Sequence, residues 1–185
     1  SSQPGAKQIS ENLEQERIVE IIRKLKQQKF KSIISLDTRN LSTMKIGYDI
    51  GVDIINDITG VENLTKASYL ISNKLPVILM HMQNNPENMQ DNPQYTFSPT
   101  DIYNFFIHKI NKLSSLGMDI SNIIVDPGIG FGKNKFHNLD ILKNLSLFHG
   151  LGVPILIGVS RKSFIGDLTI EEFKSRGIYK KSLNP

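Results

Sequence analysis

The sequence predicts an α/β fold, in which a parallel sheet is covered on its outside by helices. Two observations support this prediction. First, five short runs are almost continuously apolar, as is typical of strands buried on both faces of a parallel sheet, and they lie at 32–37, 52–60, 76–82, 122–128 and 153–161. Second, segments with helical spacing separate these runs, and strands that alternate with helices indicate a parallel sheet.

The helical segments follow in order along the chain. Residues 14–28 place four apolar side chains on one helical face, and a second helix over 38–51 is closed by a glycine. A third helix is expected within 62–73, and a polar loop at 83–99 precedes the next. That fourth helix carries an apolar stripe, and the fifth covers 138–148. We expect one domain over residues 1–185.

The position of the polar residues favours a barrel over an open sheet. They recur where the apolar runs end, namely at Asp37, Asn56 with Asp57, His81 with Gln83, Asp126, and Arg161 with Lys162. A TIM (β/α)8-type barrel builds its site from the ends of several strands, whereas a doubly wound sheet concentrates polar groups near one switch point. A full barrel needs about 250 residues, so we expect an incomplete TIM barrel of about five parallel strands, and a doubly wound sheet remains the alternative.

Composition excludes several classes of function. The formal net charge is +4 and the pI about 9.2, which suits anionic ligands without requiring nucleic acid. The basic segment 23–31 continues an amphipathic helix and holds one aromatic residue, so we expect a solvated helix end. The absence of cysteine argues against disulfides and thiolate metal sites. No apolar stretch approaches the ~20 residues that cross a bilayer, so a cytoplasmic protein with no membrane partner is expected.

The stretch VDPGIGFGKN, at 125–134, is ambiguous by itself. A Walker A loop would need glycine at Pro127 and Ser or Thr at Asn134, and the dinucleotide fingerprint would need glycine at Lys133. Both patterns therefore fail. What remains is a strand that ends in Asp126, followed by glycines that either permit close approach to a ligand or form an ordinary strand-to-helix connection.

Each polar residue also has a structural explanation. Asp37 could cap the following helix, and Asp126 could simply start a turn. Asp57 is expected on the opposite face of its strand, where it would brace a helix, and His81 is expected to be a hydrogen-bonded core histidine. Asn56 is harder to explain structurally, because an amide inside an apolar strand must find partners.

Together these residues suggest a ligand. Two carboxylates and one amide at strand ends offer acceptors and donors for a flat heterocycle rich in N–H and C=O groups. Lys162 adds a cation for a carbonyl oxygen or a phosphate. No nucleophile motif is present, so we expect chemistry that rests on binding, orientation and stabilisation of a leaving group.

Six stretches, taken in order, resemble the dihydropteroate synthase family. They are SSQPGA at the start, SLDT at 35–38, DIINDI at 53–58, MHMQNNPENMQ at 80–90, DPGIGFGK at 126–133 and GVSRKSFIG at 158–166. The resemblance implies a TIM-barrel transferase of folate biosynthesis. Such an enzyme condenses p-aminobenzoate with 6-hydroxymethyl-7,8-dihydropterin diphosphate in the presence of Mg²⁺ and releases pyrophosphate.

The same resemblance implies roles for particular residues. Asp37, Asn56, Asp126 and Lys162 would bind the pterin, with Asp126 and Lys162 as candidate catalytic residues. Four residues would bind p-aminobenzoate, with Phe131 against its ring, Ser163 at its carboxylate, and a closing loop that carries Ser2 and Pro4.

The chain also departs from the family pattern. Gln3 stands where the family loop usually has arginine. By the same resemblance the chain holds strands three to seven, while the metal ligand and the diphosphate-binding strands lie outside it, so no metal ligand is expected within this chain. A homodimer is also implied. Two alternatives stay open, namely a pterin-binding methyltransferase domain and a truncated product without catalytic role.

Overall fold

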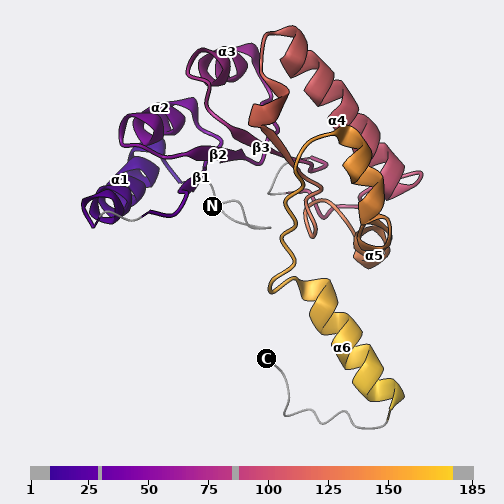
Figure 1. The fold of residues 1–185 in the computed structure, drawn as a ribbon. Helices are drawn as coiled ribbons and strands as arrows, with labels where there is room; N and C mark the ends of the chain where they lie inside the picture. Colours follow the sequence, from indigo (N-terminus) through magenta and orange to yellow (C-terminus); the bar gives the residue numbers. More distant parts are fainter. Residues whose placement is uncertain (1–8, 29–30, 85–87, 177–185) are drawn as a thin grey trace.

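The computed structural model describes residues 9–28, 31–84 and 88–176 and confirms the predicted α/β class (Figure 1). Its sheet has four parallel strands in chain order, β1-β2-β3-β4. The strands are β1 (Ser35–Asp37), β2 (Ile54–Asp57), β3 (Val77–Met80) and β4 (Ile123–Asp126). Because all four run in the same direction, their carboxyl ends meet at one edge of the sheet, where ligands bind in folds of this kind.

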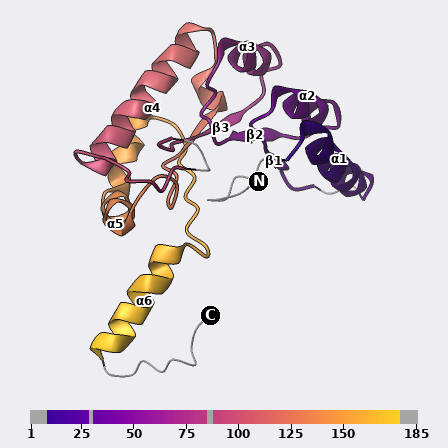
Figure 2. The same ribbon diagram turned by 180° about the vertical axis from the view of Figure 1, so that it is seen from behind.

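Helices precede, connect and follow the strands, and most of them lie along the outside of the sheet, as Figures 1 and 2 show from opposite sides. They are α1 (Glu11–Gln27), α2 (Leu41–Asp49), α3 (Leu64–Ser72), α4 (Ser98–Ser115), α5 (Lys135–Lys143) and α6 (Ser163–Ser175), with short 3-10 helices η1 (Ile120–Asn122) and η2 (Leu145–Leu151). The fifth predicted helix, over 138–148, therefore consists of α5 followed by η2. Within the described parts of the chain, no helix is long and apolar enough to cross a membrane.

The fifth predicted strand, over 153–161, is reduced to one parallel bridge between Val125 and Ile155. Backbone hydrogen bonds flank this bridge: Val125 N donates to Pro154 O at 3.0 Å, and Leu156 N donates to Val125 O at 2.8 Å. The segment lies at the outer edge of the sheet, and pairing with one neighbour alone holds a strand weakly. After it, α6 extends away from the sheet (Figure 1).

The two faces of the sheet differ in burial. On the face toward the helices, Leu36 and Ile55 are buried, with 5% and 0% of their surface exposed. On the other face Ser35 and Asp37 are exposed, and Asn56 is half-buried. A closed barrel would cover this second face with its opposite strands, so the described elements form an open part of a barrel. This agrees with the incomplete TIM barrel expected from the sequence.

Candidate functional site

Strand register places the three predicted pterin-binding residues of the sheet on the same face. Asp37 pairs with Asn56, Asn56 pairs with Ile78, and Ile78 pairs with Ile124. Paired residues point to the same face, and so does the residue two positions further along a strand. Asp126 therefore shares the face of Asp37 and Asn56, and lies one side-chain repeat, roughly 6.6 Å, further along the strand direction.

At the end of β1, Asp37 does not cap the following helix. The N-cap of α2 is Asn40, so this structural explanation of Asp37 is wrong. The segment after Asp37 is instead held by Glu14 on α1, whose carboxylate accepts hydrogen bonds from Thr38 Oγ1 at 3.0 Å and Asn40 Nδ2 at 2.7 Å. Glu14 thus fixes the chain immediately beyond the exposed Asp37 carboxylate.

At the end of β2, neighbouring residues serve opposite faces. Among the described residues, the Oδ1 atom of Asn56 is buried and has no hydrogen-bond partner. Buried polar atoms are almost always paired, so this oxygen is available to a donor on a ligand. The sequence had singled out Asn56 for this reason.

Asp57 points the other way, as predicted, and braces α3. Its carboxylate is fully buried and lies 3.4 Å from Lys66 Nζ on that helix, whose side chain is also buried. The same carboxylate accepts hydrogen bonds from Thr59 N at 2.9 Å and Val61 N at 3.2 Å. Asp57 therefore fixes the end of β2 and the orientation of its neighbour.

At the end of β4, Asp126 is a buried carboxylate that starts a turn. Its Oδ1 atom accepts a hydrogen bond from Gly128 N at 2.8 Å. Burial raises the pKa of Asp126, and three groups act against this effect: the Gly128 hydrogen bond, Lys133 and Lys162. The structural explanation of Asp126 as a turn starter is thus confirmed, but a ligand-binding role is compatible with it, because a carboxylate has further acceptor capacity.

The glycines beyond Asp126 are required by close backbone contact. Gly128 has φ +69°, and a Cβ atom there would lie 2.1 Å from His81 O. Gly132 has φ +59°, and a Cβ would lie 2.8 Å from Gln83 N. The loop over 128–132 therefore packs directly against the chain that leaves β3, which only glycine permits at these two positions.

Lys133 lies at the base of this loop and was not predicted as a site residue. Its side chain is buried, with 3% exposed. Its Nζ donates to Phe131 O at 2.8 Å and His81 O at 3.2 Å, and lies 3.1 Å from His81 Nδ1. Burial lowers the pKa of Lys133 to about 7, with Lys162 acting in the same direction and Asp126 against it. His81 is thereby the hydrogen-bonded core histidine that the sequence predicted.

The predicted aminobenzoate-binding residues of the described chain gather around one cavity of about 760 Å³. Phe131 and Ser163 line it, together with Lys133 and with Lys162, which was predicted to bind the pterin. Lys162 Nζ lies 4.2 Å from the centre of the Phe131 ring, a cation–π contact. Burial lowers the pKa of Lys162, and Asp126 acts in the opposite direction. Ser163 is the first residue of α6, where helix N–H groups favour a carboxylate.

The candidate site thus has two parts. The strand part comprises Asp37, Asn56 and Asp126, and these residues do not line the 760 Å³ cavity as far as the described residues define it. The loop part comprises Phe131, Lys162 and Ser163. Asp126 and Lys162 connect the two parts, since each shifts the pKa of the other.

Three sequence predictions lie beyond this geometry. Ser2, Pro4 and Gln3 fall outside the described residues. Among the described residues, no group of three or more His, Asp or Glu side chains could hold a metal ion.

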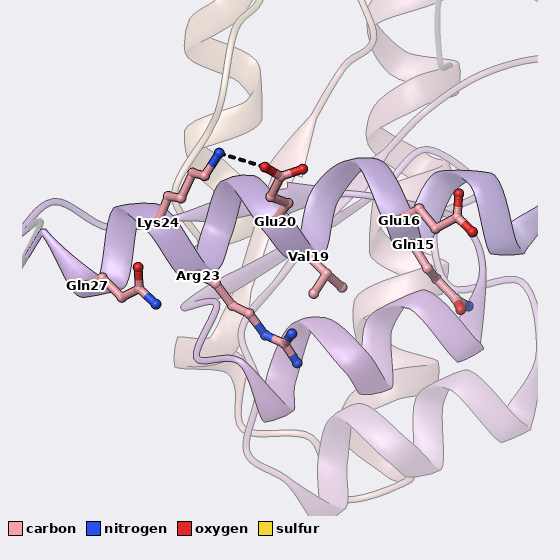
Figure 3. Close-up of a pocket in the computed structure, with 7 residues that line it drawn as sticks. All are labelled: Gln15, Glu16, Val19, Glu20, Arg23, Lys24 and Gln27. Carbon is pink, nitrogen blue, oxygen red and sulfur yellow. Dashed lines mark hydrogen bonds and ion pairs between the residues drawn. The ribbon is translucent and has the colours of Figure 1, made fainter.

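A second hollow, of about 550 Å³, runs along the outer surface of α1 (Figure 3). Its described lining comes from this helix alone, and Lys24 and Glu20 form an ion pair at its rim. Lining side chains include Gln15, Val19 and Arg23, of which none is buried. Its described lining residues include no convergent buried polar groups, which mark most ligand sites, and we assign no ligand to it.

Comparison with known proteins agrees with this geometry. The family model described as pterin binding enzyme matches residues 1–183. Dihydropteroate synthase of Escherichia coli K12 is 36% identical over 168 residues, which cover 91% of this chain and 59% of that protein.

Solved structures agree as well. The Yersinia pestis dihydropteroate synthase with a sulfonamide drug complex has a TM-score of 0.84 at 38% identity, over 91% of this chain and 60% of that one. The Xanthomonas albilineans enzyme with 4-aminobenzoic acid has a TM-score of 0.84 at 31% identity, over 91% and 59%. The chain thus spans about three fifths of the relatives' length, and it belongs to the pterin binding enzyme family.

Proposed function

We propose that this chain carries the pterin-binding and aminobenzoate-binding part of a dihydropteroate synthase. One observation carries the proposal: Asn56 Oδ1 is buried, without a partner in the part of the chain that the structure describes, on the face of the sheet that also holds Asp37 and Asp126. An unpaired buried acceptor between two carboxylates suits a ring edge with several N–H donors. The pterin ring offers such an edge.

The residues act by binding and orientation. Asp126, when ionised, accepts from the guanidine-like edge of the pterin, and Lys162 donates to the ring carbonyl. Phe131 packs against the aminobenzoate ring, and the first turn of α6 at Ser163 receives its carboxylate. Held in this way, the arylamine nitrogen faces the pterin methylene carbon.

The reaction replaces one bond with another at that carbon. The new C–N bond forms as the C–O bond to diphosphate breaks, the amine loses a proton, and pyrophosphate departs. When bound, Mg²⁺ would neutralise charge that develops on the departing diphosphate. No other step depends on that ion. A cytoplasmic location, a homodimer and the absence of nucleic-acid and membrane partners belong to the same proposal.

Isothermal titration tests the proposal. The chain is titrated with 7,8-dihydropterin and then, in the presence of the pterin, with p-aminobenzoate. We expect binding of both ligands and a roughly tenfold weaker pterin affinity in Asn56→Ala, the loss expected for one buried hydrogen bond. Asn104→Ala, at an exposed position of α4, is the matched control and should bind as the wild type does. Absence of heat on a chain that circular dichroism shows to be folded would refute the proposal.

A further inference from the structure

Lys133 is a buried cation whose donors match its surroundings. An ammonium group has three N–H donors and no acceptor. Three acceptors face it, namely Phe131 O at 2.8 Å, His81 Nδ1 at 3.1 Å and His81 O at 3.2 Å. Since lysine only donates here, His81 Nδ1 accepts, and the neutral imidazole carries its proton on Nε2. Burial and the charge of Lys133 both lower the pKa of His81, which keeps this ring neutral.

These contacts join two segments that are distant in sequence. His81 directly follows β3, whereas Phe131 belongs to the glycine loop after β4. Other side chains also hold the loop: Tyr95 donates its hydroxyl to Gly132 O at 2.9 Å, Gln90 Nε2 donates to Gly130 O at 2.8 Å, and the buried Asn138 accepts from Gly130 N at 2.7 Å. Asn138 ties the loop to α5, whereas the buried Lys133 ties it to the end of β3 and binds the carbonyl of Phe131, whose ring lies beneath Lys162.

We propose that Lys133 is a positioning residue for the arylamine half of the site: it anchors the glycine loop to the end of β3 and thereby fixes the Phe131 ring against which the arylamine packs. The inference deepens the proposed function and rests on it. Lys133 does not touch the reacting atoms in this scheme. Its role is to hold the backbone of Phe131, so that the ring is in place before the second substrate arrives.

The protonation state of Lys133 controls this anchor. The charged form satisfies all three acceptors, whereas the neutral amine has two donors and leaves one acceptor unpaired. Other titratable groups also face Lys133 or interact with it, namely His81 beyond β3, Asp126 at the end of β4, Lys162 before α6 and His137 on α5. An arylamine ring that binds to the fixed loop therefore binds more tightly when Lys133 is charged. By linkage, binding of that ring must raise the pKa of Lys133.

Variants test the anchor on the full chain. Lys133→Met keeps the length of the side chain and removes all three hydrogen bonds. We expect its dissociation constant for p-aminobenzoate at pH 6, where the wild-type Lys133 is charged, to rise at least tenfold. The dissociation constant for 7,8-dihydropterin at pH 8.5, where Asp126 is ionised in both proteins, should change less than threefold. Lys143→Met, at an exposed position of α5, is the control and should leave both constants unchanged. An equal change in both constants, or in neither, for a folded Lys133→Met overturns the proposal.

A measurement on the wild type covers the case in which Lys133→Met does not fold. With lysine labelled at the ε carbon, NMR over pH 6 to 9.5 should show one side chain that titrates near neutrality. Saturation with p-aminobenzamide, which has the ring but no carboxylate charge, should raise that midpoint by at least 0.3 pH units. An unchanged midpoint overturns the proposal. If the wild type binds neither pterin nor arylamine, the proposed function fails, and this inference fails with it.

Discussion

Asn56 and Asp57 are adjacent on β2, and the structure predicts opposite consequences when each is changed. Asn56→Leu removes a buried oxygen without a described partner, whereas Asp57→Asn removes a buried charge that is paired with Lys66. The first substitution should leave the free energy of unfolding unchanged or raise it by about 1 kcal/mol, because an unpaired polar group is lost from the interior. The second should lower it.

The size of the loss at Asp57 follows from its partners. Removing one member of a buried ion pair costs roughly 3–5 kcal/mol, because the other charge stays buried without compensation. Lys66 keeps a contact with Glu62 Oε1 at 3.1 Å, although the Glu62 side chain is more than half exposed. Asparagine at position 57 also retains an oxygen for Thr59 N. We therefore expect about 2–3 kcal/mol, a large part of the 5–15 kcal/mol that stabilises an ordinary domain.

Urea unfolding followed by circular dichroism measures these changes through linear extrapolation. Pterin titration of the same samples should show the reverse ranking, with affinity lost in Asn56→Leu and kept in Asp57→Asn at temperatures where that variant is folded. The double substitution Asp57→Asn with Lys66→Met should recover part of the lost stability, since no buried charge then remains unpaired. A loss of stability in Asn56→Leu as large as that in Asp57→Asn would refute the assignment of the two side chains to opposite faces.

Four further outcomes are expected. Asp126→Asn should weaken pterin binding by roughly 10- to 100-fold, the worth of a charge-assisted hydrogen bond, as measured by titration calorimetry. Burial raises the pKa of Asp126 above its unfolded value, so its ionised form is lost at a higher pH than usual. Pterin affinity should therefore fall as the pH decreases towards that raised pKa, and an affinity that stays constant down to pH 4 would contradict this. The pKa of Lys133 falls to about 7 on folding, so the unfolded chain binds more protons than the folded chain between about pH 7 and the ordinary lysine pKa. The free energy of unfolding should therefore rise with pH over that window in the wild type, and rise less in Lys133→Met. Phe131→Ala should weaken p-aminobenzoate binding at least tenfold and pterin binding little, and a reversed ranking would show that the ring serves the pterin instead.

The sequence predicted the structure well where the spacing of apolar and polar residues along a strand determines it. Continuous apolar runs predicted the four strands. Because successive side chains of a strand point to opposite faces, the sequence also predicted that Asp57 would lie on the face opposite Asn56 and brace a helix. The fifth strand was overpredicted because an apolar run does not show which neighbours are present to pair with it: Ile155 makes a single bridge at the edge of the sheet, and Leu156 and Val159 are exposed. Asp37 was ambiguous because a cap and a ligand-binding acid have the same sequence pattern.

Lys133 was missed for a different reason. A lysine after a glycine loop normally lies in solvent, and its burial depends on His81, which precedes it by 52 positions. The available signal was indirect. The glycines at 128 and 132 indicated a close backbone approach, and a lysine at the base of a tightly packed loop has little access to solvent. The hydrogen-bond partner of Lys133, His81, could not be deduced without the register of β3 against β4.

The two parts of the site should therefore respond differently to change. The pterin part is built on neighbouring strands, whose ladder hydrogen bonds and outward brace at Asp57 hold Asn56 independently of any loop. The arylamine part is carried by a glycine loop that lacks such a ladder and depends on Lys133, a group whose charge changes near neutral pH. Strand residues offer precise positions, while loops must be fixed by additional contacts.

It follows that substitutions on β2 and β4 should alter pterin affinity with little dependence on pH above neutrality. Arylamine affinity, in contrast, should weaken as pH rises through 7 even in the wild type. Titration of both ligands across pH 6 to 9 separates these two behaviours, and parallel pH profiles would show that the two parts share one anchor.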